Sequence, residues 1–283
     1  MQLKELYSLG KENLRQNAIE SPGLEAYLLL SESEALSDFI DIYTHPEKEV
    51  DQKSYKNFQD LVERRLKREP ISYITGEKEF YSRCYKVNSA VLIPRPETEL
   101  LVDEALLLAN QIASPRILDI GTGSGCISVT LAYMCNNAKI VATDISQKAL
   151  KVAKENIFKH GKQDNISLAG GDLITFFKNK SFDIVISNPP YISESEIKKL
   201  EPDVKDYEPT IALRAGEGGL KYIKRIISDS RRVLKEEGWC VLEVGQGQAE
   251  KVMNLFKEYG FIAVSTKKDL NGIDRLILAK WKK

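Results

Sequence analysis

The segment LDIGTGSGCIS, residues 118–128, joins an apolar run typical of a strand to an apolar run typical of a helix, with glycine at three alternate positions. Gly121, Gly123 and Gly125 carry no Cβ, so the chain can turn tightly here and a ligand can approach the N–H groups at the helix start. Such a turn is typical of doubly wound α/β sheets. The spacing is G-x-G-x-G rather than G-x-G-x-x-G, and no Gly-Lys-Ser/Thr follows, which disfavours a dinucleotide or nucleoside triphosphate site.

Downstream of Pro94, short apolar runs alternate with longer segments of helical periodicity, which is the pattern of a parallel sheet covered on both faces. Asn271 and Gly272 join the last two apolar runs and favour an antiparallel turn. We therefore expect an α/β fold with a Rossmann-like sheet of seven strands, mostly parallel with an antiparallel edge pair. Strands are expected at residues 116–121, 138–144, 165–170, 182–188, 238–245, 261–270 and 274–281, and helices at 97–110, 125–134, 146–161, 220–237 and 249–260.

The first part of the chain has a different pattern. Apolar residues at three- and four-residue spacing predict helices, and Pro70 ends the last of them. A stretch rich in Tyr, Ile and Val with turn residues follows and predicts a β-hairpin connector. The helices are expected at 3–14, 24–36 and 55–66, and the predicted domains are a helical substrate-recognition domain (1–69), the connector (70–93) and the α/β domain (94–283).

The composition excludes several classes of protein. The 41 Lys and Arg residues balance 41 Asp and Glu residues, and residues 1–70 hold 10 basic and 14 acidic side chains, so the head of the chain is a poor module for reading nucleic acid. The four cysteines lack any C-x-x-C pair, so no metal site or disulfide framework is indicated. No apolar run resembles a signal peptide or a membrane span, and we expect a cytoplasmic protein without membrane contact.

Acidic residues follow the second and third predicted strands of the α/β domain. Asp144 lies 23 residues beyond Gly121 and suits the hydroxyls of a ribose. Asp172 suits an adenine amino group, with Leu173 packing on the ring. Each aspartate has an alternative role as the cap of the helix that follows it, but three successive strand ends that carry the glycine turn and two aspartates favour a cofactor site.

The stretch ISNPPYIS, residues 186–193, follows the fourth predicted strand, which we expect beside the first where the strand order reverses. Asn188 precedes a proline and is held extended. Pro189 and Pro190 donate no backbone hydrogen bond, so oxygen acceptors predominate. Such a cradle suits a planar NH2 group conjugated to a carbonyl or a ring, and Tyr191 can stack on that plane; a core tyrosine and a purely structural turn are the alternatives.

About 30 residues, 191–219, separate this strand from the next helix, far more than the roughly 2–6 residues usual for such a connection. Long loops at the carboxyl edge of a parallel sheet often form lids or bind substrates. We expect this loop to cover the ligand site, with a flexible insertion as the alternative.

The glycine turn with its two aspartates resembles the cofactor site of S-adenosylmethionine-dependent methyltransferases, over residues 94–283. Further stretches resemble the release-factor glutamine methyltransferases of the HemK type over nearly the whole chain. They are ISYITGEKEFY (71–81), VLIPRPETELLVDEAL (91–106), LDIGTGSGCIS, SNPPYI, YEPTIALRAGEGGL (207–220), LEVGQGQ and DLNGIDRLILAK, of which IPRPETE is the most specific.

The resemblance implies transfer of a methyl group to the side-chain N5 of the glutamine in the Gly-Gly-Gln loop of class 1 peptide chain release factors, with S-adenosyl-L-methionine as the cofactor. It implies that Asn188 through Tyr191 are the catalytic and substrate-binding residues. Arg95 and Glu97 would cover the cofactor, although Glu97 is as well explained by charge at a helix start. The implied cofactor-binding residues are Gly121, Thr122, Gly123, Ser124, Gly125, Asp144, Asp172, Leu173 and Asn188.

Two other functions remain open from the residues alone. The N-P-P-Y motif also occurs in enzymes that methylate N6 of adenine or other amino groups of DNA or RNA, and a non-catalytic nucleoside sensor could use the same sheet. The acidic head and the lack of a basic, aromatic-rich segment disfavour the first, and we expect no direct nucleic acid binding and a monomer. Glu243 and Gln246 follow the fifth strand, where a structural role in the loop is expected.

Overall fold

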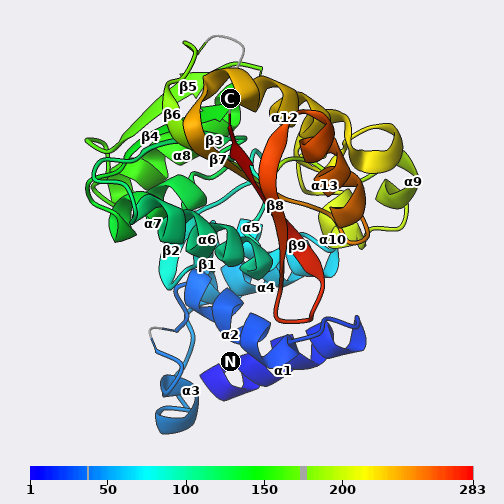
Figure 1. Ribbon diagram of the computed structural model, residues 1–283. Helices are drawn as coiled ribbons and strands as arrows, with labels where there is room; N and C mark the ends of the chain where they lie inside the picture. The colour runs from blue at the N-terminus through cyan, green and yellow to red at the C-terminus, as the bar shows by residue number, and fades with distance from the viewer. Residues whose placement is uncertain (37, 173–176, 283) are drawn as a thin grey trace. The chain divides into compact units, whose positions relative to one another are not determined.

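The computed structural model describes residues 1–36, 38–172 and 177–282 and divides into two compact units. Unit 1 comprises Met1–Glu77 and Glu201–Tyr207, and unit 2 comprises Lys78–Leu200 and Glu208–Lys283. Figure 1 labels elements of both units where there is room.

Unit 1 is helical, because its apolar residues recur at helical spacing and pack into one core around Leu6, Leu29 and Phe58. Asp51 begins the longest helix by accepting hydrogen bonds from the N–H groups of Lys53 and Ser54. Its helices are α1 (Leu3–Gln16), α2 (Pro22–Glu32), α3 (Asp41–Thr44), α4 (Gln52–Leu66), α5 (Ile71–Ile74) and α10 (Pro202–Lys205).

A buried arginine ties an inserted segment into unit 1. The Arg65 side chain is 7% exposed, and its guanidinium lies 2.6 Å from Glu25 Oε2 and 2.8 Å from Asp203 Oδ2. The Tyr207 hydroxyl donates to the Lys67 carbonyl at 2.6 Å. Part of the long loop after residue 191 therefore belongs to the helical unit, an insertion that the sequence pattern did not predict.

Unit 2 contains a seven-stranded sheet in the order β5-β4-β3-β6-β7-β9-β8, in which β9 pairs antiparallel with both β7 and β8. The remaining strand pairs are parallel, so the predicted Rossmann-like sheet with an antiparallel edge pair is confirmed. β1 and β2 form a separate two-stranded sheet. The strands are β1 (Glu77–Phe80), β2 (Arg83–Lys86), β3 (Arg116–Ile120), β4 (Lys139–Asp144), β5 (Ile166–Gly170), β6 (Phe182–Ser187), β7 (Leu234–Glu243), β8 (Phe261–Lys268) and β9 (Asp274–Trp281).

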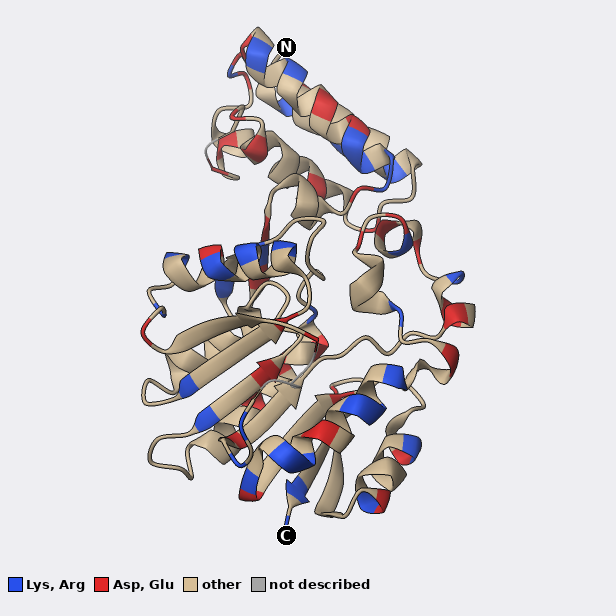
Figure 2. Cartoon of the chain, turned by 90° about the horizontal axis from the view of Figure 1, so that it is seen from above, with Lys and Arg blue, Asp and Glu red and all other residues tan. Residues whose placement is uncertain are grey.

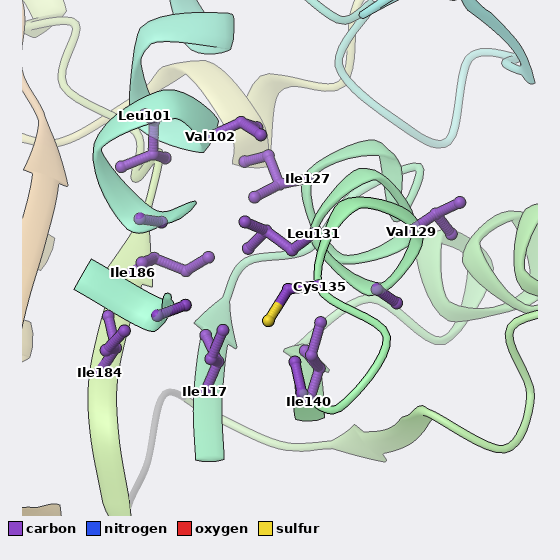
Figure 3. Close-up of a cluster of buried hydrophobic side chains, with 14 of the residues drawn as sticks. Leu101, Val102, Ile117, Ile127, Val129, Leu131, Cys135, Ile140, Ile184 and Ile186 are labelled. Atoms are coloured by element: carbon purple, nitrogen blue, oxygen red, sulfur yellow. The ribbon is translucent and has the colours of Figure 1, made fainter. Parts of the chain in front are cut away.

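Helices cover both faces of this sheet because successive residues of a strand point to opposite faces. Ile117 of β3 packs in one core cluster, which Figure 3 shows with side chains from α6, α7 and the neighbouring strands. Leu118 packs in a second cluster with residues of α12 and α13. The helices are η1 (Pro96–Thr98), α6 (Glu99–Ala109), α7 (Cys126–Met134), α8 (Gln147–Lys159), α9 (Glu194–Ile197), α11 (Thr210–Leu213), η2 (Glu217–Gly219), α12 (Lys221–Val233) and α13 (Ala249–Glu258).

Several predicted boundaries differ from the structure: the helix expected at 24–36 is Pro22–Glu32, and the helix expected at 55–66 begins at Gln52. The helix expected at 220–237 ends at Val233, because β7 begins at Leu234, which pairs with Phe182 of β6. The expected connector includes the short helix α5 directly after Pro70, where a proline at the helix start is compatible with helical geometry. Strand pairing therefore outweighs the helical pattern after Val233, and a short helix interrupts the segment after Pro70 whose composition favours strands.

Charges of both signs are interspersed along the helices in Figure 2, whereas the strands are mostly uncharged. This distribution agrees with the formal net charge of zero. Within the described residues, no helix has both the length and the apolar character that a transmembrane segment requires.

We predict that Gly10→Ala destabilises unit 1. Alanine normally favours a helix over glycine by about 1 kcal/mol, but a Cβ at Gly10 would overlap the Phe58 ring. Overpacking of this kind costs roughly 1–3 kcal/mol. Hydrogen–deuterium exchange should show faster exchange in α1 and α4 with unchanged protection in β3. The exposed Ser8→Ala on the same helix is the control, and slower exchange in Gly10→Ala would contradict the prediction.

Candidate active site

A cavity opens in unit 2 at the carboxyl ends of β3, β4 and β6. Its walls come from the glycine turn after β3, the ends of β4 and β6, the segment before α6 and the loop that contains α11. The lining residues are Ala90, Val91, Leu92, Pro94, Arg95, Thr98, Ile120, Gly121, Thr122, Gly123, Ser124, Cys126, Ile127, Thr143, Asp144, Ile145, Ser146, Ala149, Gly171, Asp172, Ser187, Asn188, Pro189, Pro190, Ile211, Ala212, Tyr222 and Ile226.

The glycine turn has the backbone that the sequence suggested, with φ of +73° at Gly121, +56° at Gly123 and +80° at Gly125. A Cβ at Gly121 or Gly123 would meet no atom within 4 Å, whereas a Cβ at Gly125 would lie 3.2 Å from the Cβ of Ala153 in α8. The first two glycines therefore keep the cavity open, and the third allows close packing of α7 against α8.

The glycine turn is held in place by hydrogen bonds to the end of β4. The N–H groups of Gly121 and Thr122 both donate to the Thr143 carbonyl at 2.8 Å, and Gly123 N donates to Asp144 Oδ2 at 3.0 Å. The N–H groups available to an anion are instead those of the first turn of α7, which have no acceptor within the helix.

Asp144 lines the cavity at the end of β4, and its two oxygens accept hydrogen bonds from Gly123 N and from Ser146 N at 2.8 Å. Ser146 caps α8 by accepting from Ala149 N. Capping of α8 by Asp144, the alternative considered from the sequence, is therefore not observed. Burial is the main cause that raises the Asp144 pKa above its ordinary value.

Asp172 lines the cavity but is exposed, and its Oδ2 lies 2.8 Å from Arg225 Nη2 of α12. Leu173, the predicted neighbour of an adenine ring, lies outside the described residues. Arg95 also lines the cavity and is paired with Glu208, a buried carboxylate that additionally accepts from Ile93 N at 3.1 Å. Glu208 thus ties the long loop to the segment that carries Arg95.

Asn188, Pro189 and Pro190 line the same cavity as the glycine turn. Asn188 Nδ2 donates to Thr98 Oγ1 at 3.0 Å, so one hydrogen of this amide is bound by the protein. The oxygen of the same amide is directed away from Thr98. The cradle of acceptors stays a prediction, and Thr98, which holds Asn188, had no role in it.

Tyr191 does not belong to the described residues that line the cavity. Its ring packs against the core on the α12 and α13 face, and its hydroxyl lies 3.5 Å from Glu243 Oε1. Gln248 Nε2 donates to the Tyr191 carbonyl at 2.9 Å. Stacking of Tyr191 on a substrate stays a prediction, and the observed contacts give this side chain a structural anchor.

A buried acid, Asp119, lies in β3 directly before the glycine turn. Its Oδ2 accepts from the hydroxyls of Thr122 at 2.7 Å and Ser128 at 2.6 Å. In the part of the chain that the structure describes, Asp119 Oδ1 is the one buried side-chain oxygen or nitrogen without a hydrogen-bond partner. Burial raises the pKa of Asp119 to about 6, a change that the two donated hydrogen bonds partly oppose.

Several residues that organise the site were not singled out from the sequence as functional. Thr98, Glu208 and Gln248 hold Asn188, Arg95 and Tyr191, and Glu243, expected to be structural, contacts both Thr98 and Tyr191. Thr98 and Glu208 lie in stretches that carried the family resemblance, but nothing in their local pattern indicates which distant residue they contact.

The chain matches two family models, the Methyltransferase small domain over residues 97–201 and the PrmC N-terminal domain over residues 5–76. A release factor glutamine methyltransferase of Clostridium acetobutylicum is 40% identical over 244 residues, covering 86% of each chain. Another of that name, from Thermodesulfovibrio yellowstonii, is 42% identical over 243 residues, covering 85% of this chain and 86% of the relative.

The fold also resembles a solved structure, a methyltransferase from Pyrococcus furiosus. The two chains are 16% identical, with a TM-score of 0.54 over 73% of this chain and 92% of the other. At this level of identity the similarity concerns the fold alone.

We predict that Asp119 lowers the free energy of unfolding as the pH rises, because the buried carboxyl group then loses its proton. Because the pKa is raised from 3.8 to about 6 in the folded state, folded chains bind more protons than unfolded chains between these values, so the unfolding free energy falls across that window. Two pH units correspond to about 3 kcal/mol at most. Urea unfolding should show that the free energy of unfolding falls less between pH 4 and pH 6 in Asp119→Asn than in the wild type.

The exposed Asp164→Asn is the control for loss of one charge and should keep the wild-type difference between the two pH values. An equal fall in Asp119→Asn and the wild type would mean that Asp119 is ionised throughout and that the prediction is wrong.

Proposed function

Because the chain belongs to the release factor glutamine methyltransferases, we propose that it transfers a methyl group from S-adenosyl-L-methionine to the side-chain N5 of the Gly-Gly-Gln glutamine of a class 1 peptide chain release factor. The observation that most supports this is that Asn188, Pro189 and Pro190 line one cavity with Gly121, Gly123 and Asp144. The proposed amide cradle and the proposed nucleoside site would therefore share one cavity.

The residues of the cavity fit the proposed cofactor. Gly121 and Gly123 leave open space where a side chain would stand, and Asp144 presents a carboxylate at the end of β4. Asp144 would hold the ribose, Asp172 would border the adenine, and the N-terminal turn of α7 would favour the methionine carboxylate. When bound, S-adenosylmethionine supplies an electrophilic methyl group on a sulfonium.

The chain itself would hold the glutamine amide. Its nitrogen is a poor nucleophile because the lone pair is delocalised into the carbonyl, so positioning has to lower the barrier. Asn188 Oδ1 and the backbone oxygens beside Pro189 and Pro190 would accept the two amide hydrogens and stabilise the positive charge that develops on nitrogen. The alkylated nitrogen is acidic and loses its proton afterwards, so the cradle needs no general base.

The proposal extends to partners and location. It comprises a release factor as the protein substrate, no direct binding of nucleic acid, a monomeric enzyme and a cytoplasmic reaction. The acidic head supports the absence of nucleic acid binding, because it opposes contact with phosphates. Methylation of DNA or RNA is the less favoured alternative, since the relatives are named as release factor enzymes.

We predict that the wild-type chain, given labelled S-adenosylmethionine, labels a release factor on the glutamine of its Gly-Gly-Gln loop. Mass spectrometry of the loop peptide should show a gain of one methyl group on that residue. A release factor with Asn in place of this Gln is the control. Label on DNA or RNA, with none on the release factor, would contradict the proposal.

We predict that Asn188→Ala and Asp144→Ala have separate effects. Asn188→Ala should lower kcat by roughly 10²-fold, as for the loss of one preorganised polar contact, and leave the Kd of the cofactor nearly unchanged. Asp144→Ala should mainly raise that Kd, because it removes the proposed ribose acceptor. Calorimetric titration of the cofactor beside single-turnover kinetics separates the two effects, and equal loss of cofactor binding in both variants would argue against the assigned roles.

A further inference from the structure

The register of the sheet brings a buried acid beside Asn188. Ser187 of β6 pairs with Leu242 of β7 in a parallel ladder, so the residues that follow them, Asn188 and Glu243, are neighbours at the same edge. Glu243 is 2% exposed. Thr98 of η1 lies between the two side chains, within hydrogen-bond distance of both.

The three side chains form a directed chain of hydrogen bonds. Thr98 Oγ1 donates to Glu243 Oε2 at 2.7 Å and accepts from Asn188 Nδ2 at 3.0 Å. A hydroxyl has one hydrogen, and the ionised form of the Glu243 carboxylate, which can only accept, takes it. Thr98 can then only accept from Asn188, so the amide must direct its NH2 group toward Thr98 and its oxygen away from Thr98.

We propose that Glu243 and Thr98 are positioning residues that fix the orientation of the Asn188 amide and thereby make the site specific for the NH2 group of a carboxamide. This inference rests on the proposed function. A reversed amide would present NH2 to the substrate nitrogen, which is also a donor, and would instead suit a carboxylate. The buried Glu243 carboxylate therefore influences which substrate binds, through the hydroxyl group of Thr98.

The ionisation of Glu243 controls the strength of the hydrogen bonds that link Glu243, Thr98 and Asn188. Burial raises its pKa to about 7, and Glu97 adds to the increase, whereas the hydrogen bonds from Thr98 and Tyr191 and the charge of Arg275 on β9 lower it. Asp269 pairs with Arg275 and weakens that favourable charge.

Protonation leaves the carboxyl group with one strong acceptor oxygen for two donors, Thr98 and Tyr191. The Thr98 hydrogen is then held less firmly, and the second orientation of the amide becomes accessible. Activity should therefore be full only well above the Glu243 pKa of about 7 and should fall as the pH decreases through that pKa. Arg95 is a further charged group near Tyr191, beside Arg275 and Glu97.

The first test compares Thr98→Val, which keeps the shape but has no hydroxyl, with Thr98→Ser, which keeps the hydroxyl. Thr98→Val should lower kcat about tenfold or more, in the range seen when an outer partner of a site residue is removed, with the Kd of the cofactor unchanged. It should also lose the fall in activity below pH 7, because the carboxylate no longer acts on Asn188. Thr98→Ser should retain both the rate and the pH profile.

The second test measures specificity directly. Calorimetry should give the Kd of a release-factor peptide with Gly-Gly-Gln and of a matched peptide with Gly-Gly-Glu. The wild type should prefer glutamine, and the preference should shrink at least tenfold in Thr98→Val and at pH 6. Glu243→Gln, which offers one acceptor oxygen at every pH, should show the weaker preference without pH dependence from pH 6 to 8.5.

Thr130→Val is the matched control, because Thr130 is buried, shares a hydrogen bond with Tyr85 at 2.8 Å and does not line the cavity. It should lower stability without changing kcat or the peptide preference. If Thr98→Val does not fold, the pH profile and the peptide preference of Glu243→Gln are compared with those of the wild type instead. This substitution conserves the volume of the side chain.

The inference is overturned if Thr98→Val or Glu243→Gln keeps both the wild-type pH profile and the wild-type preference for glutamine. A wild-type chain that methylates no release factor would instead refute the proposed function. The two failures are thus distinguishable from the same set of assays.

Discussion

The parallel pairing of β3 with β4 on one side and with β6 on the other is the constraint on which the site depends. It brings the glycine turn, Asp144 and Asn188 to one edge of the sheet, although β4 and β6 follow β3 by long stretches of chain. The Ser187 hydroxyl donates to the Ile120 carbonyl at 2.7 Å and joins two of these strand ends. Any slip of this register would separate the acceptor cradle from the glycine turn.

Two buried acids lie behind the cavity, and both act through hydroxyl groups. Asp119 accepts from Thr122 and Ser128 and so supports the glycine turn, while Glu243 accepts from Thr98 and so supports the cradle. Burying a carboxylate is costly, and the cost is reflected in pKa values raised to about 6 and about 7. In the proposed site, the two acids would order its two halves without having to contact a ligand.

The long connection after β6 has anchors in each unit. Residues 201–207 belong to the helical unit, where Asp203 pairs with Arg65. Glu208, the next residue, is buried in the α/β unit, where it holds Arg95 and the Ile93 N–H group. The sequence predicted that this loop serves the site, and Ile211 does line the cavity. Its division between the two units follows from ion pairs between residues more than a hundred positions apart.

Alternating apolar strands and helices, the glycines at 121, 123 and 125, and the N-P-P-Y motif were sufficient to predict the sheet and the group of residues near its carboxyl edge, because local period and backbone freedom are written in neighbouring residues. The partners of those residues were decided only by the tertiary structure. Thr98 and Glu243 contact each other across 145 positions, and Thr98 contacts Asn188 across 90. A hydrogen bond between side chains depends on strand register and burial, which no local pattern in a single sequence specifies.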